Sequence, residues 1–136
     1  MTMTPTEVAR RYGETWNGRD ADALVAAFKG GGILCHPDTY PGVSGEAIGA
    51  FVKGLWTAFP DFHIELLNGG EIAPNLVANH WLVQGTHTGQ GTDGSEPTGR
   101  GIALKGVSII KVEGDKIVSD HIYFDLMAAV AQLAPK

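Results

Sequence analysis

The segment from Lys105 to Asp125 constrains the fold of this chain more than any other stretch. Two runs rich in β-branched residues flank the pair Gly114–Asp115, which favours a tight turn because both positions tolerate positive φ. We therefore predict a β-hairpin that turns at 114–115. An unbroken ladder from that turn would place Ile109 opposite Asp120.

The same register predicts which side chains share a face, because successive side chains of a strand alternate between its two faces. One face would be apolar apart from a single carboxylate, with Val107, Ile109, Val118, Asp120, Ile122 and Phe124. The other would carry Ser108, Ile110, Ser119, His121, Tyr123 and Asp125. A lone carboxylate in apolar surroundings is costly unless it is paired or used in chemistry, so Asp120 is the first candidate functional residue.

Composition narrows the function classes. A chain of 136 residues suits a single domain spanning 1–136, and a formal net charge of -5 argues against nucleic acid as a partner. No apolar run approaches the roughly 20 residues of a membrane span, and the polar N-terminus does not resemble a secretory signal, so we expect a cytoplasmic protein away from membranes. Cys35 is the single cysteine, and the histidines lack zinc-like spacing, so we expect no disulfide and no metal site.

Three helices are predicted in the first 60 residues. The first starts at the capping box Thr4–Glu7 and carries aromatic residues at a spacing of four, which places them on one face. The second starts at Asp20 or Asp22 and should end at the glycine run 30–32. The third follows a cap at Ser44, and apolar residues recur through it at steps of three and four until Pro60.

Strands dominate the remainder of the chain. We expect a short strand at 33–36, a strand from 62 to 67 followed by a turn at 68–70, and a longer strand at 76–87. The stretch 88–101 should form a long loop beside a site, and 126–133 a short docked helix. Helices followed by antiparallel strands indicate an α+β fold. We predict a curved antiparallel sheet wrapped over the N-terminal helices, forming a cone with an apolar pocket.

Several short motifs, in this order, carry a family resemblance: Ala58-Phe-Pro-Asp-Phe-His63, Gly85-Thr-His-Thr-Gly89, Pro97-Thr-Gly-Arg100, Gly114-Asp-Lys-Ile-Val118, and Asp125 with Gln132-Leu133. From about Trp16 to Leu133 the chain resembles the SnoaL-like polyketide cyclase or ester cyclase family. The resemblance implies the cone-shaped α+β fold shared with ketosteroid isomerase, scytalone dehydratase and nuclear transport factor two. It also implies a homodimer packed sheet to sheet, in which His121 and Tyr123 would be interface residues.

The resemblance further implies a catalytic aspartate on the last strand. Characterised cyclases of this family use the Asp of a His-aromatic-Asp run to remove an activated C–H proton for an intramolecular aldol closure. Aligned without a gap, that run falls on 120–122, so Ile122 holds the family's acid position and Asp120 holds the histidine position. A residue two positions away faces the same side but lies about 7 Å further along the strand.

The candidate site residues therefore each have two readings. Asp120 is either a general base whose pKa is raised by burial or one half of a structural ion pair. His80 is either a hydrogen-bond donor to a substrate oxygen or Asp120, or a structural group; His36 could likewise be a donor at the cavity mouth. His87 is predicted to brace the long loop. We expect the pocket to be lined by Trp16, Trp56, Gln84, Ile122 and Phe124, although helix periodicity alone would explain both tryptophans as core.

Two functions remain open from the sequence. The first is binding of a hydrophobic, oxygenated small molecule with cofactor-free proton transfer, as in cyclisation, isomerisation or dehydration, in which Asp120 is the base and His80 or His36 the donor. The second is a non-catalytic binding or assembly module of the same fold, since one fold hosts many functions.

Overall fold

The computed structural model describes residues 3–91 and 94–134. Its elements, in chain order, are α1 (Pro5–Thr15), α2 (Ala21–Ala26), β1 (Phe28–Cys35), β2 (Val43–Ser44), α3 (Glu46–Ala58), β3 (His63–Ala73), β4 (Leu76–Thr86), β5 (Gly101–Glu113), β6 (Lys116–Phe124) and α4 (Leu126–Leu133). The strands form one six-stranded sheet in the order β2-β1-β6-β5-β4-β3. Neighbouring strands are antiparallel except β1 and β6, which are parallel.

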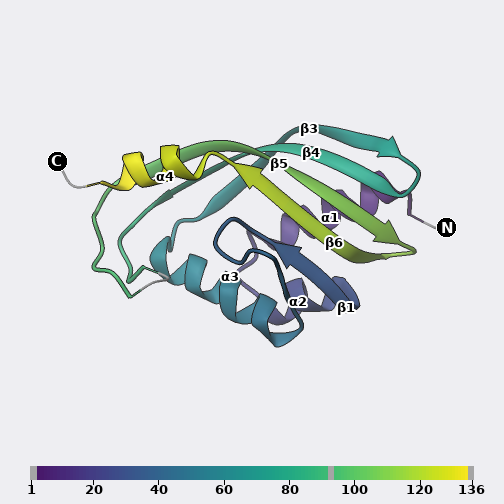
Figure 1. The fold of residues 1–136 in the computed structure, drawn as a ribbon, viewed down its shortest axis with the longest axis horizontal. Coiled ribbons are helices and arrows are strands. Elements are labelled where there is room, and N and C mark those ends of the chain that lie inside the picture. Colours follow the sequence, from purple (N-terminus) through teal and green to yellow (C-terminus); the bar gives the residue numbers. More distant parts are fainter. Residues whose placement is uncertain (1–2, 92–93, 135–136) are drawn as a thin grey trace.

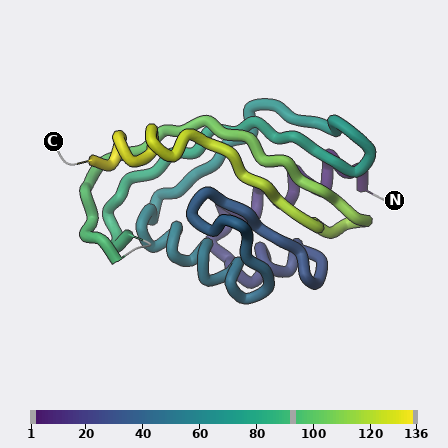
Figure 2. Tube along the Cα trace, viewed as in Figure 1, coloured from purple at the N-terminus to yellow at the C-terminus, as the bar shows by residue number. Residues whose placement is uncertain are grey.

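The sheet arches over the helices, as predicted for an α+β cone (Figure 1). Helices α1, α2 and α3 lie on its concave side, and α4 continues from β6. The loop between β4 and β5 lies at the same end of the molecule as α4, opposite the N-terminus (Figure 2). The core between sheet and helices includes Val8, Leu24, Ile48, Val52 and Val77, each at most 3% exposed. Within the described residues, no helix is long and apolar enough to cross a membrane.

The capping residues in the sequence correctly predicted where α1 and α2 begin. The Thr4 hydroxyl accepts a hydrogen bond from Glu7 N, and the Asp20 carboxylate accepts one from Ala23 N, as expected for N-caps. The third helix differs from its prediction at the start, because its N-cap is Gly45 rather than Ser44 and makes no side-chain capping bond.

Two glycine-containing segments were wrongly predicted to end elements. The second helix ends at Ala26, and glycines 30–32 lie inside β1, where the pairing with β6 is irregular between Phe28 and Ile33. A Cβ on Gly32 would lie 2.8 Å from the Lys29 carbonyl oxygen, so glycine permits this irregular stretch. Likewise, β3 runs through the expected turn at 68–70 with a bulge between Leu66 and Asn68, and the chain reverses only at residues 74–75.

The last hairpin forms where predicted, but its register changes after the first two residue pairs from the turn. Glu113 pairs with Lys116 and Val112 with Ile117, and then Lys111 pairs with Ser119, so Val118 is an extra residue. Beyond this bulge Ile110, not Ile109, lies opposite Asp120. The predicted face was right for the β6 residues Asp120, Ile122 and Phe124, which line the cavity described below, and wrong for the β5 residues. Ser108 and Ile110 share that face instead of Val107 and Ile109.

Candidate functional site

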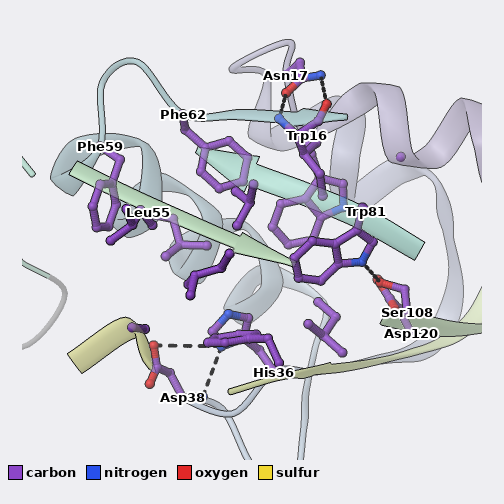
Figure 3. Close-up of a pocket in the computed structure, with 18 of the residues that line it drawn as sticks. Trp16, Asn17, His36, Asp38, Leu55, Phe59, Phe62, Trp81, Ser108 and Asp120 are labelled. Carbon is purple, nitrogen blue, oxygen red and sulfur yellow. Dashed lines mark hydrogen bonds and ion pairs between the residues drawn. The ribbon is translucent and has the colours of Figure 1, made fainter. Parts of the chain in front are cut away.

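A cavity of about 650 Å³ lies between the concave face of the sheet and the helices. Its walls come from α1, α3, α4, the strands β3 to β6 and the loop that follows β4, and most of the side chains are apolar or aromatic. Figure 3 shows Trp16, Phe59, Phe62, Trp81 and Leu55 around it, with Asp120 and His36 among them. A concave apolar space with few polar groups is the usual form of a small-molecule site.

Five of the eight predicted site residues line this cavity: Asp120, His36, Trp16, Ile122 and Phe124. The other three do not. His80 and Gln84 belong to the opposite face of β4, since Asn79, Trp81 and Val83 point inward, and His80 Nδ1 lies 3.4 Å from Asn68 Nδ2. Trp56 is a core residue whose Nε1 donates to the Trp16 carbonyl oxygen at 3.0 Å. The prediction that these three residues line the pocket was therefore wrong.

Asp120 is 1% exposed. Burial raises the pKa of Asp120 from 3.8 to about 7, while the side chains of Tyr12 and Ser108 oppose that rise. Its Oδ2 accepts a hydrogen bond from the Tyr12 hydroxyl at 2.6 Å, and its Oδ1 has no hydrogen-bond partner among the described residues. The ion pair considered from the sequence is not formed, because both salt bridges within the described residues involve other side chains.

Tyr12 is a site residue that the sequence placed on one face of the first helix but did not mark as functional. It lies on the buried face of α1, is 3% exposed, and packs edge-on against Phe28 at a centroid distance of 5.3 Å. Burial and the charge of Asp120 raise the pKa of Tyr12 well above 10, so the phenol keeps its proton and acts as a donor. A hydroxyl on a core-facing aromatic residue was the available signal, since a buried tyrosine usually needs a partner.

Ser108 and Trp81 form the second polar contact beside Asp120 (Figure 3). Trp81 Nε1 donates to Ser108 Oγ at 3.0 Å, which leaves the serine proton for another acceptor. The Trp81 ring can lie across β5 because Gly106 has no side chain; a Cβ there would overlap the ring and lie 2.7 Å from the Tyr123 carbonyl oxygen. Because the bulge at Val118 shifts the register of the hairpin, the sequence alone predicted that Ser108 would lie on the opposite face.

His36 lies just after β1, near the same end of the strand ladder as Asp120. Leu34 pairs with Asp120, and His36 follows two residues later on the same face. The ring packs against Phe51 and Phe124 at centroid distances of 4.7 and 5.1 Å. Burial lowers the pKa of His36 from 6.5 to about 4, so the ring is neutral near pH 7. Its Nδ1 accepts from Asp38 N at 3.0 Å, which places the proton on Nε2 and makes that nitrogen a donor.

Comparison with known proteins identifies the family. The family model of the SnoaL-like polyketide cyclases matches residues 6–133, which is nearly the whole chain. The chain belongs to the SnoaL-like polyketide cyclase family. No curated protein matches it significantly.

Solved structures support the fold of this family member. A candidate SnoaL-like polyketide cyclase from Jannaschia sp. CCS1 is 20% identical with a TM-score of 0.81, covering 97% of this chain and 93% of that one. A hypothetical protein of ketosteroid isomerase-like fold from Catenulispora acidiphila, in complex with trimethylamine, is 19% identical with a TM-score of 0.81, covering 98% and 96%. AclR, a candidate hydroxylase from Streptomyces galilaeus, is 20% identical with a TM-score of 0.79, covering 95% and 80%. At these identities the likeness concerns the fold alone.

No group of three or more His, Cys, Asp or Glu side chains is arranged to hold a metal ion in the part of the chain that the structure describes. The polar side chains that line the cavity include the buried carboxylate of Asp120 with the hydroxyl groups of Tyr12 and Ser108, and the imidazoles of His36 and His87, which are held by backbone hydrogen bonds; the other polar lining residues are Arg10, Glu14, Asn17, Asp38, Asn79 and Ser95. Such a set can accept a proton and donate hydrogen bonds.

Proposed function

We propose that this SnoaL-like protein binds an apolar, oxygenated small molecule in its cavity and transfers a proton on it without a cofactor. Asp120 would act as the general base. The observation that carries this proposal is the burial of Asp120 in the cavity wall, which raises its pKa to about 7. A base titrating near neutral pH combines a useful fraction of the charged form with enough basicity to take a proton.

The chemistry would be abstraction of a proton from a carbon next to a carbonyl group. Asp120 Oδ1 takes the proton, and the electron pair of the C–H bond moves through the adjacent bond to the carbonyl oxygen. His36 Nε2–H would donate a hydrogen bond to that oxygen, because its neutral ring is held by Asp38 N and its position follows from the β1–β6 register. The resulting enolate can regain the proton at another carbon or attack an electrophilic carbon of the same molecule, which gives isomerisation or cyclisation.

Tyr12 would keep Asp120 in place during this reaction. Its hydroxyl bonds one carboxylate oxygen and leaves the other without a partner within the described residues. The base would therefore present a single oxygen in a fixed orientation, which favours proton transfer to one face of a bound ligand.

An exchange assay tests the proposal without the natural substrate. 2-Tetralone is an apolar bicyclic ketone with acidic C–H groups, and their replacement by deuterium in D₂O is measured by NMR. We expect the wild-type protein to accelerate this exchange, with a rate that rises through about pH 7. Asp120→Asn should lose roughly 100-fold of that acceleration or more. The control is Asp61→Asn, because Asp61 lies at the surface and bonds Thr86. Equal exchange rates in Asp120→Asn and wild type would reject Asp120 as the base.

A non-catalytic binding module is the second candidate, and Ile122 favours it. The side chain at the family's acid position is apolar and lines the cavity, so the contact made by the family's base is missing. Binding of 2-tetralone by the wild-type protein without any acceleration of exchange would support this second function.

We further propose that the protein forms a homodimer through the outer face of the sheet. Tyr123 on that face is 59% exposed and Ile33 is 42% exposed, which suits an interface with aromatic and aliphatic contacts. Sedimentation of the wild type and of Tyr123→Glu would test this, with the variant expected to shift toward monomer.

A further inference from the structure

His87 lies at the end of the cavity that is remote from Asp120. Asp120 is level with Ile110 on β5 and Val77 on β4, whereas His87 follows the far end of β4, ten residues beyond Val77. Ten residues span roughly 30 Å of straight strand, and less along this curved one. His87 packs against Phe59 at a centroid distance of 5.4 Å, and Figure 3 shows Phe59 at the opposite side of the cavity from Asp120.

The loop between β4 and β5 fixes the ring of His87. The His87 backbone N–H donates to the Arg100 carbonyl oxygen at 2.8 Å, and its carbonyl oxygen accepts from Gly99 N at 2.8 Å. Its Nδ1 accepts from Thr98 N at 3.3 Å, with Thr98 Oγ1 at 3.2 Å. Because Nδ1 is an acceptor from a backbone N–H, the proton of the neutral ring lies on Nε2, on the side away from the loop. Position, orientation and tautomer are thus all determined.

The Nε2–H group of this fixed ring has no protein acceptor among the described residues, although His87 is only 5% exposed. A buried donor without an acceptor destabilises a fold, so such groups are rare in native proteins. The ring packs against Phe59, and although Ser95 of the same loop also lines the cavity, no described group accepts a hydrogen bond from Nε2. A ligand oxygen reaching this end of the cavity would satisfy it.

We propose that His87 is a second binding subsite, which donates from Nε2 to a carbonyl or hydroxyl oxygen on an apolar ligand. This subsite rests on the proposed use of the cavity for small molecules, but not on proton transfer by Asp120. It gives the ligand class a further property: an apolar body with an oxygen acceptor that lies at the Phe59 end of the cavity.

A pair of isosteric probes tests this subsite. 2-Acetylnaphthalene has a ketone oxygen, and 2-isopropenylnaphthalene has a CH₂ group in its place. Their affinities are measured by calorimetry for the wild type and for His87→Phe, which keeps a ring against Phe59 and removes both nitrogens. The ratio of the two affinities should shift against the ketone by about tenfold in the variant, because one net hydrogen bond is lost. Taking the ratio cancels the general effect of the substitution on cavity shape.

Two further variants keep the result interpretable. Thr98→Val disturbs the loop contact but retains Nε2–H, so its affinity ratio should equal that of the wild type. His36→Phe removes the other cavity imidazole, and a shift in this variant together with no shift in His87→Phe would overturn the subsite. In ¹⁵N-histidine-labelled protein, the ketone but not the alkene should move the His87 Nε2 resonance; an unmoved resonance would also overturn it. Failure of both probes to bind would instead reject the small-molecule cavity on which the proposed function depends.

Discussion

Replacement of Asp120 by asparagine should make the protein more stable at high pH, and the structure predicts how much. Asparagine has nearly the same shape, keeps an oxygen that can accept from the Tyr12 hydroxyl, and cannot ionise. The difference in the free energy of unfolding between the variant and the wild type therefore isolates the cost of a charge at this buried position. Other titrating groups are common to both proteins and cancel.

The sign and size of this stability difference follow from the pKa values of Asp120 in the unfolded and folded chain. In the unfolded chain Asp120 ionises near 3.8, and in the folded chain it keeps its proton up to about pH 7. Between these values the folded chain binds more protons than the unfolded chain, so the wild type loses stability as pH rises. The loss is absent below pH 3.8 and complete above pH 7. A difference of about three pKa units corresponds to about 4 kcal/mol.

Urea unfolding of both proteins from pH 4.5 to pH 8.5 measures this curve. The stability difference should rise by at most about 1.4 kcal/mol per pH unit and level off above pH 7. Asp61→Asn is the control: hydrogen bonds from Thr86 N and Oγ1 lower the pKa of Asp61, so its contribution to stability changes only below the unfolded value of 3.8, and its difference curve should be flat over this pH range. A flat difference curve for Asp120→Asn would refute the claim that burial holds its proton near neutral pH.

Two further substitutions test contacts around the same carboxylate. Tyr12→Phe removes the hydrogen bond that lowers the pKa of Asp120, so the pH midpoint of tetralone exchange should rise by about one to two units; an unchanged midpoint would mean that the bond does not act on the charged form. Gly106→Ala would force a methyl group against the Trp81 ring and should lower stability by about 1–3 kcal/mol, measured by urea unfolding. Gly70→Ala is its control, since a Cβ there meets nothing within 4 Å, and an equal loss in both variants would contradict the packing argument.

The order of helices and strands could be predicted because the signals are local. Capping residues marked the starts of α1 and α2, and the change of apolar period after Pro60 marked the start of β3. Glycine runs misled the prediction, because glycine serves both turns and irregular strands. The run at 30–32 lies in β1, where Gly31 has a positive φ and Gly32 is approached closely by the carbonyl oxygens of Lys29 and Ile117, and the neighbouring sequence does not indicate that approach.

The candidate site was predicted only where strand alternation alone was enough. Alternation within β6 placed Asp120, Ile122 and Phe124 together, and no bulge lies between them. Residues on β5 were assigned to a face of the sheet from the predicted hairpin register. The extra residue at Val118 shifts that register by one, so each of these residues lies on the face opposite to the predicted one. His80 was assigned to the wrong side of the cavity for a different reason: both faces of β4 mix apolar and polar residues, so the pattern could not say which face is inward.

The charges of Asp61 and Asp120 have opposite effects on the stability of this protein. Asp61 is exposed and receives two hydrogen bonds from Thr86, so its charge stabilises the junction between α3 and the sheet. Asp120 is buried, one of its oxygens has no partner within the described residues, and its charge destabilises the fold. An apolar or amide side chain at 120 would remove that cost without disturbing the shape of the cavity wall. A carboxylate that weakens the protein at neutral pH, in the wall of an apolar cavity, makes no favourable contribution to folding, and this is what the proposed proton transfer to a ligand requires of it.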